Sequence, residues 1–327
     1  MTGTGSVVEA TDLCFDYPGQ RALDRVSFGI APGTITALIG PNGAGKTTLM
    51  RCLAALEAPF SGAVAVAGID TRRDPRAVHR AVGYLADEFG LYDTLTVRQC
   101  LLHAGAMRGL GRERTAAAIG TTVQRLGIAD RLATRAGELS RGLRQRLAIA
   151  QAILHDPRVL ILDEPASGLD PEARRALSNL LKALRDGGMT IIVSSHILAE
   201  LEDYSTHMLI LRDGRLLSFQ PIAGRTASGP RRLAIALAAP DARLMPVLAG
   251  QSEVADIVMV RPGLEASFAF VGDASAQAGL LRALVLNGFP VARFELQHEA
   301  MQDAYLARVA AADGPSLARS AEPERMT

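Results

Sequence analysis

The sequence predicts an α/β fold, in which a mostly parallel sheet is covered by helices, followed by a second and smaller domain. Short apolar runs alternate with helical patterns over residues 1–220, an order typical of parallel sheets. A mainly helical stretch from Leu95 to His155 interrupts this alternation. The loop-forming segment PIAGRTASGP, at Pro221–Pro230, then marks a domain boundary. These observations predict a core domain with an inserted helical subdomain and a separate C-terminal domain.

The elements of the first domain, residues 1–220, are placed by their apolar runs and helical periodicity. The helical subdomain is expected over about 88–157. The predicted strands are Thr34–Gly40, Ala63–Ala67, Val82–Leu85, Val159–Asp163, Thr190–Ser194 and His207–Leu211. The predicted helices of the core are Lys46–Glu57, Pro171–Arg185 and Ile197–Asp203.

The C-terminal domain, residues 230–312, has the predicted order β-α-β-β-α-β-α, which favours a small α+β (ferredoxin-like) fold. Its two central strands meet at the turn Pro262-Gly263. A polar tail, 313–327, is expected to be disordered. The predicted elements are Arg231–Ala238, Ala242–Leu248, Ala255–Val260, Glu265–Val271, Ala276–Asn287, Val291–Leu296 and Ala300–Ala311.

Composition limits the classes of partner. Basic and acidic side chains number 35 and 34, and this balance gives no reason to expect nucleic acid as a partner. The three cysteines form no CxxC pair, which favours a reducing compartment. We see no signal peptide and no apolar run of about 18 residues, the length that crosses a bilayer. If the protein acts at a membrane, we expect another chain to hold it there.

The segment Gly40–Thr47 fits the phosphate-binding pattern GxxxxGK[ST], with an apolar strand before it and a helical pattern after it. Its glycines let backbone N–H groups face inward, and the following helix presents its positive dipole end to an anion. Lys46 adds a charge for the outer phosphates, and the Thr47 hydroxyl can hold Mg²⁺. The sequence therefore predicts a P-loop NTPase core. The loop consists of Gly40, Pro41, Asn42, Gly43, Ala44, Gly45, Lys46 and Thr47.

Two acids, Asp163 and Glu164, follow the continuous apolar run Val159–Leu162. Such a run is typical of a strand buried on both faces of a parallel sheet, so its carboxyl end should lie near the phosphate loop. Asp163 can there hold Mg²⁺, directly or through water. Glu164, one residue further, can orient or deprotonate an attacking water.

The segment Leu139–Arg146, LSRGLRQR, resembles the LSGGQ signature of ABC-type ATPases. Arg141 replaces the first glycine of that signature and Leu143 replaces the glutamine, whereas Ser140 and Gly142 remain. The resemblance implies that Ser140 and Gly142 present a hydroxyl and an N–H group to a γ-phosphate.

Further residues match the same family in order, over roughly residues 7–220. Tyr17 corresponds to the aromatic residue that stacks on adenine, and His196 to the switch histidine that contacts the γ-phosphate. Ser167–Asp170 resembles the loop that communicates across the dimer. Asp87 stands where the family has a glutamine, and its carboxylate can still offer an oxygen to Mg²⁺.

The resemblance implies an ATPase that binds ATP and Mg²⁺ and works as a head-to-tail dimer, most simply a homodimer. One subunit would supply Gly40–Thr48, Asp163, Glu164 and His196, and the other would close the site with Ser140 and Gly142.

A transmembrane permease is the expected further partner, because Phe89–Thr96 resembles the same region in cassettes of bacterial exporters. The protein would then lie on the cytoplasmic face of the cell membrane. Two alternatives stay open, a soluble ABC-type ATPase of translation or DNA maintenance and a regulatory module with degenerate ATPase activity.

Overall fold

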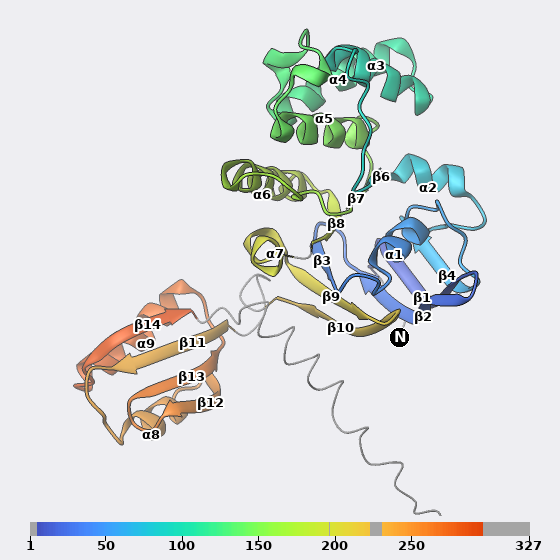
Figure 1. The fold of residues 1–327 in the computed structure, drawn as a ribbon. Helices are drawn as coiled ribbons and strands as arrows, with labels where there is room; N and C mark the ends of the chain where they lie inside the picture. Colours follow the sequence, from blue (N-terminus) through green and yellow to red (C-terminus); the bar gives the residue numbers. More distant parts are fainter. Residues whose placement is uncertain (1–4, 196, 223–230, 297–327) are drawn as a thin grey trace, which may run out of the picture. The chain divides into compact units, whose positions relative to one another are not determined.

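The computed structural model describes residues 5–195, 197–222 and 231–296 of the chain. The described residues belong to two compact units whose boundary in sequence lies between Gln220 and Pro221. Figure 1 shows both units, which are treated separately below. None of the helices in these ranges combines the length and the apolar character that a membrane span requires.

The first unit is built around a six-stranded sheet with the strand order β10-β9-β3-β8-β7-β6. Parallel pairing joins β3 to β8 and β9, and β7 to β8 and β6. Every residue of β3, β7 and β8 is buried, which explains why apolar residues predominate in their sequences. The strands are β3 Ile35–Ile39, β6 Val82–Leu85, β7 Val159–Leu162, β8 Thr190–Ser194, β9 His207–Arg212 and β10 Arg215–Pro221.

A second sheet of the same unit has the order β2-β1-β4-β5, and its described pairings are antiparallel. The strands are β1 Val8–Tyr17, β2 Gln20–Ile30, β4 Ser61–Val66 and β5 Ile69–Asp70. The run Ala63–Ala67 was predicted to belong to the mostly parallel sheet, and this prediction is wrong. Val66 instead pairs with Val8 of β1, because the nearby N-terminal strands offer an antiparallel edge.

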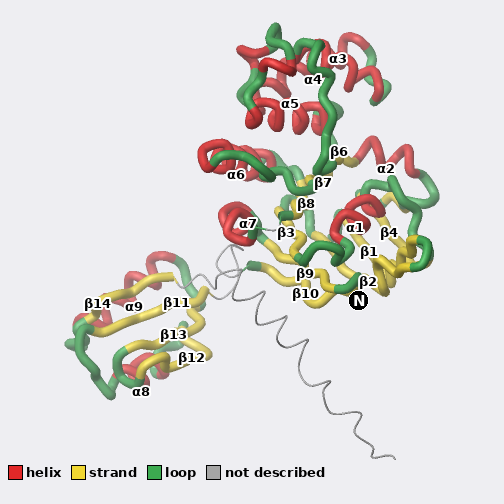
Figure 2. Tube along the Cα trace, viewed as in Figure 1, coloured by secondary structure: helices red, strands yellow, loops and turns green. Residues whose placement is uncertain are grey.

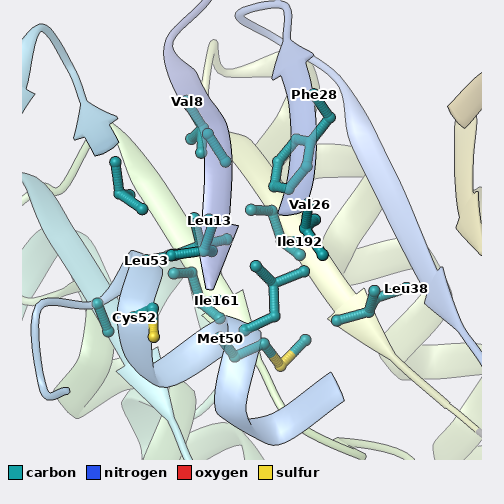
Figure 3. Close-up of a cluster of buried hydrophobic side chains, with 14 of the residues drawn as sticks. Val8, Leu13, Val26, Phe28, Leu38, Met50, Cys52, Leu53, Ile161 and Ile192 are labelled. Atoms are coloured by element: carbon teal, nitrogen blue, oxygen red, sulfur yellow. The ribbon is translucent and has the colours of Figure 1, made fainter. Parts of the chain in front are cut away.

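One hydrophobic core joins the two sheets to the first helix (Figure 3). Val8, Leu13 and Val26 come from the antiparallel sheet, and Leu38, Ile161 and Ile192 from the parallel sheet. Met50 and Leu53 of α1 fill the space between them. This packing fixes the start of α1, and with it the phosphate loop, against β3. The core also contains further buried residues of the same unit.

Four helices of the first unit accompany the core sheets: α1 Lys46–Leu53, α2 Pro75–Ala81, α6 Pro171–Asp186 and α7 Leu198–Tyr204. Helix α1 ends at Leu53 and not at Glu57 as the periodicity predicts, because Ala55 has a left-handed φ of 54°. Asp170 caps α6 by accepting from the Ala173 N–H group, and Pro171 occupies its first turn.

Three helices lie within the range 88–157: α3 Val97–Met107, α4 Arg112–Leu126 and α5 Arg141–Ile153. Figure 2 shows them as a group of helices with no strand among them. Thr96 and Gln99 form a capping box at the start of α3, and the left-handed Gly127 ends α4. Ser140 caps α5. Two short turns, η1 Ala129–Arg131 and η2 Ala136–Glu138, connect α4 to α5.

The second unit contains a four-stranded sheet with the order β12-β13-β11-β14, and its strand pairs are antiparallel. Its elements follow the predicted order β-α-β-β-α-β. They are β11 Arg231–Leu237, α8 Leu244–Ala249, β12 Val254–Arg261, β13 Glu265–Phe270, α9 Ala274–Leu286 and β14 Val291–Leu296. The unit has its own core, which includes Leu233, Leu244 and Phe268. The predicted helix Ala300–Ala311 and the tail 313–327 lie outside the described residues.

Candidate nucleotide-binding site

The phosphate loop connects β3 to α1, as the motif requires. Gly45 has a φ of 99°, and a β-carbon there would lie 2.6 Å from the backbone oxygen of Ala22. Only glycine fits this position. The Lys46 side chain is buried, and its Nζ donates to the backbone oxygens of Gly40 at 2.8 Å and Pro41 at 3.2 Å. The backbone carbonyl groups of the loop thus hold the Lys46 ammonium group in place.

The carboxyl ends of β7 and β8 bring Asp163 and Ser194 together, because Leu162 is paired with Val193. Thr47 Oγ1 donates to Asp163 Oδ2 at 2.8 Å. Ser194 Oγ donates to Asp163 Oδ1 at 2.6 Å and accepts from the Glu164 N–H group at 2.8 Å. Both carboxylate oxygens of Asp163 are therefore engaged, and the residue is 3% exposed.

Glu164 has a left-handed φ of 46°, a conformation that costs energy for a non-glycine residue. The Ser194 hydroxyl holds this backbone through the Glu164 N–H group. The Ser167 N–H group donates to the Glu164 carbonyl at 3.1 Å. Strain of this kind is often stored at functional sites, and here it turns the chain away from the line of β7 directly after Asp163.

These residues surround a cavity of about 360 Å³. Its lining is mostly polar and comes from the phosphate loop, from the ends of β7 and β1 and from the segment after β6. The lining residues are Tyr17, Gln20, Ala22, Asn42, Gly43, Gly45, Lys46, Thr47, Thr48, Asp87, Asp163 and Glu164. The fold therefore brings most of the site residues predicted in the first domain to one place.

Tyr17 and Asp87 lie at this cavity from two different elements. Tyr17 is 39% exposed, so part of its ring is available to a ligand, and its hydroxyl lies 3.4 Å from Thr48 Oγ1. Phe15 supports the ring edge-on at a centroid distance of 5.0 Å. Asp87 follows β6, whose last residue accepts a hydrogen bond from the Asp163 N–H group at 2.9 Å.

Ser140 and Gly142 do not reach this cavity. Ser140 lies at the start of α5, where its Oγ accepts from the Leu143 N–H group at 3.4 Å. Together with Asp170 and Ala173 at the start of α6, Ser140 and Gly142 line a separate cavity of about 230 Å³. Within one chain, Ser140 and Gly142 are therefore not among the lining residues of the phosphate-loop cavity. His196 lies outside the described residues.

The donor set at the phosphate loop suits a magnesium ion. The Thr47 hydroxyl and the Asp163 carboxylate supply hard oxygen ligands, which Mg²⁺ prefers. In the described ranges no three His, Cys, Asp or Glu side chains gather to hold a metal by themselves. An ion at Thr47 and Asp163 would therefore need further oxygens, such as those of a nucleotide phosphate.

The charge at the site also acts on its surroundings. Burial, and after it the Asp163 carboxylate, raises the pKa of Tyr84 in β6 above its ordinary value. Tyr84 therefore stays a neutral phenol beside the carboxylate at physiological pH.

Sequence reasoning missed Ser194, which contacts both acids of the site. Ser194 carries no motif, and its place follows only from the register of β7 and β8. Its position at the end of a predicted strand could have indicated it. Polar residues at the carboxyl ends of neighbouring parallel strands lie at one edge of the sheet. Gln20 and Ala22 line the cavity from the antiparallel β1–β2 hairpin and were not predicted either, because they belong to no motif.

Comparison with known proteins identifies the family. A family model described as "ABC transporter" matches residues 23–167. The bacitracin transport ATP-binding protein BcrA of Bacillus licheniformis is 30% identical over 303 residues, which cover 92% of this chain and 96% of BcrA. The Nod factor export ATP-binding protein I of Rhizobium etli is 30% identical over 213 residues, 65% of this chain and 67% of that protein.

A solved structure agrees with these sequence relatives. The ATP-binding subunit of an ABC transporter superposes with a TM-score of 0.59 at 31% identity, over 66% of this chain and 90% of that one. A polar cavity at the phosphate loop, acids at a strand end and a separate signature agree with this family. The chain belongs to the ATP-binding proteins of ABC transporters and is an ATP-binding, ATP-hydrolysing subunit of that family.

Proposed function

We propose that this subunit works as a head-to-tail homodimer and drives export through a transmembrane permease. The observation that supports a dimer is the separation of the two cavities. Residues of the segment Gly40–Thr48 line one of them together with Asp163 and Glu164, whereas Ser140 and Gly142 line the other. A second chain in the opposite orientation would bring its signature to the phosphate loop and complete the site.

Within such a site the residues have distinct tasks. Lys46 and the N–H groups of the loop bind the outer phosphates of ATP, and Tyr17 stacks on adenine. Thr47 and Asp163 hold Mg²⁺, which supplies charge neutralisation on the phosphates, with Asp87 as a further oxygen donor. Glu164 orients and deprotonates the attacking water, and His196 contacts the γ-phosphate.

The signature completes the chemistry only on closure. Ser140 and Gly142 of the second chain donate to the γ-phosphate, where negative charge must be stabilised in the transition state. Phosphoryl transfer to water depends on positioning and on charge stabilisation more than on covalent catalysis. Because one chain does not bring both groups to the same cavity, hydrolysis occurs in the closed dimer, and release of the products reopens it.

A groove of about 560 Å³ is the surface that we assign to the permease. It lies between α2 and β6 of the core and the C-terminal end of α3. Leu56 and Met107, 51% and 76% exposed, supply apolar surface, and no acidic residue is among its lining residues. Arg76, Arg80 and Arg108 give it positive charge. It therefore fits a short apolar segment that carries an acidic side chain.

The remaining assignments follow from this proposal. Coupling to a permease would place the chain on the cytoplasmic face of the cell membrane. The second unit, with its predicted range of residues 230–312, would be a ferredoxin-like accessory domain. Export is the favoured direction, because a relative named for export, the Nod factor protein, is as identical to this chain as BcrA. No relative described above is named for translation or DNA maintenance, so the soluble alternative has no such support.

The permease assignment is tested by affinity purification of the tagged chain from detergent-solubilised membranes. We expect a multi-spanning membrane protein to co-purify with the wild type. Arg80→Glu, which reverses a charge of the groove, should reduce the recovered permease about tenfold, as loss of an interfacial charge pair would.

Arg112→Glu is the matched control, because Arg112 is exposed at the start of α4 and is absent from the groove lining. It should leave the recovery unchanged, and both variants should bind ATP like the wild type. Recovery of no membrane protein with the wild type would contradict the assignment. If Arg80→Glu recovers as much permease as the wild type does, the permease binds to another surface of this chain.

A further inference from the structure

Arg141 occupies the position at which the family signature has a glycine, and the structure shows a specific contact for its side chain. Arg141 Nη2 donates to the backbone oxygen of Ser167 at 3.0 Å. The guanidinium also lies directly against Gly168, where a β-carbon would overlap with it. Arg141 thus covers the Glu164–Asp170 turn, which connects β7 to α6.

This turn begins at the proposed catalytic glutamate. The Ser167 N–H group donates to the carbonyl of Glu164, so the residue whose carbonyl accepts from Arg141 is also bonded to Glu164. Through Ser194, Glu164 is in turn bonded to Asp163. One chain of hydrogen bonds therefore runs from the first residue of α5 to the acids beside the phosphate loop.

A second contact supports the same connection. A β-carbon on Gly142 would lie 3.2 Å from the Ala173 side chain, so the starts of α5 and α6 approach each other closely. Asp170 fixes the start of α6 by accepting from the Ala173 N–H group at 2.8 Å. The start of α5 is thereby joined to both ends of the Glu164–Asp170 turn.

We propose that Arg141 is a positioning residue that transmits the movement of the signature at one ATP site to Glu164 at the other. The inference rests on the shared-site dimer of the proposed function. There, Ser140 of one protomer serves the phosphate loop of its partner, whereas Glu164 of the same protomer serves its own loop. A side chain that joins α5 to the Glu164–Asp170 turn therefore connects two different sites.

The test uses mixed dimers purified through two different affinity tags. One protomer carries Glu164→Gln, so that hydrolysis depends on Glu164 of its partner. Arg141→Ala is then placed either in that same protomer or in the partner. Both dimers contain the same two substitutions and differ only in their arrangement, so general effects on folding are equal.

We expect Arg141→Ala to lower kcat about tenfold when it lies in the protomer that keeps Glu164, because small displacements of positioned groups are costly. The KM for ATP should stay within about twofold, since the phosphate loop is untouched. In the other arrangement kcat should equal that of the dimer with Glu164→Gln alone. Arg112→Ala, at the first position of α4, is the matched control and should have no effect in either protomer.

The opposite result, a loss only when Arg141→Ala accompanies Glu164→Gln, would show that Arg141 acts across the interface and would overturn the proposal. Equal rates in both arrangements would overturn it as well. A further arm places Ser140→Arg in the Glu164→Gln protomer and should stop hydrolysis. If that mixed dimer still hydrolyses ATP, the proposed shared site is wrong. The proposal that Arg141 connects two sites is then wrong as well.

Gly168→Ala gives an independent check, because the added methyl would displace the Arg141 guanidinium. Its matched control is Gly33→Ala, since Gly33 has a similar φ of 68° and open space around its β-carbon position. We expect Gly168→Ala to lower kcat as Arg141→Ala does, and Gly33→Ala to leave it unchanged. The double variant should lose little more than either single one, and full additivity would contradict the contact.

Discussion

His155, in the turn that follows α5, is a residue whose environment sets its protonation state. Its Nε2 atom lies 3.1 Å from the backbone oxygen of Val82, and its Nδ1 atom is buried without a partner. Burial, and after it the charge of Arg108, lowers the pKa of His155 to about 4. The imidazole is therefore neutral in the folded protein, with the proton on Nε2.

This depressed pKa predicts acid sensitivity. Between about pH 6.5 and pH 4 the unfolded chain binds a proton at His155 that the folded chain does not bind, so the free energy of unfolding falls as pH falls. We expect the free energy of unfolding of His155→Gln to fall less steeply than that of the wild type as pH falls. The difference in slope should be up to about 1 kcal/mol per pH unit. Urea denaturation of both proteins at several pH values in this window measures the difference.

His103→Gln is the control, because His103 is exposed on α3. Its unfolding free energy should follow that of the wild type across the window. An equal acid sensitivity of His155→Gln and the wild type would show that His155 is not the residue responsible.

At the residue scale, the sequence predicts those site residues whose chemistry depends on a short, contiguous motif. The loop Gly40–Thr47 and the pair Asp163-Glu164 are contiguous in sequence, so their spacing was sufficient to place them. Ser194 and Arg141 act through contacts with residues 30 and 26 positions away. A single sequence carries no sign of such contacts, and Arg141 therefore counted only as a departure from the signature.

Two glycines of the helical block show how element packing decides the effect of one methyl group. A β-carbon on Gly105 in α3 would overlap with the Thr115 side chain of α4, whereas one on Gly120 in α4 would meet open space. Thr115 cannot yield easily, because it is β-branched and its Oγ1 donates to the backbone oxygen of Gly111 at 3.0 Å.

We expect Gly120→Ala to stabilise the protein by about 0.5–1 kcal/mol, since alanine favours the helix. Gly105→Ala gains the same helix propensity and nevertheless should destabilise by roughly 1–2 kcal/mol, because the methyl overpacks the α3–α4 contact. Chemical denaturation of the two variants gives both values. Stabilisation by both substitutions would contradict the close packing of α3 on α4.

The elements themselves were predictable to different degrees. Apolar residues predominate in the strands β6, β7 and β8, and the bounds of these strands agree with the prediction within one residue. The strands β1 and β2 were not assigned, because their burial alternates irregularly through several register shifts. Which sheet β4 joins depends on a pairing with β1, and periodicity within β4 does not show it.

At the scale of the whole molecule, the two compact units have separate hydrophobic cores. The cavity at the phosphate loop and the cavity at the signature are both formed within the first unit. A unit with its own core can fold alone. The sequence predicts a domain boundary at residues 221–230, because that segment is rich in turn formers.

We therefore expect a fragment of residues 1–220 to unfold cooperatively and to bind ATP with a Kd within about twofold of the full chain. Circular dichroism and titration with a fluorescent ATP analogue measure both properties. The full chain is the control. A fragment that aggregates, or that binds ATP much more weakly, would show that the first unit depends on the second.

The separation of the phosphate loop from the signature has a consequence for regulation by mass action. If two chains must meet to complete a site, the rate per chain depends on protein concentration and vanishes on dilution below the dimerisation constant. A permease that holds two copies side by side would raise their effective concentration to about the millimolar range. Free subunits would then consume little ATP, and assembly itself would switch the hydrolysis on.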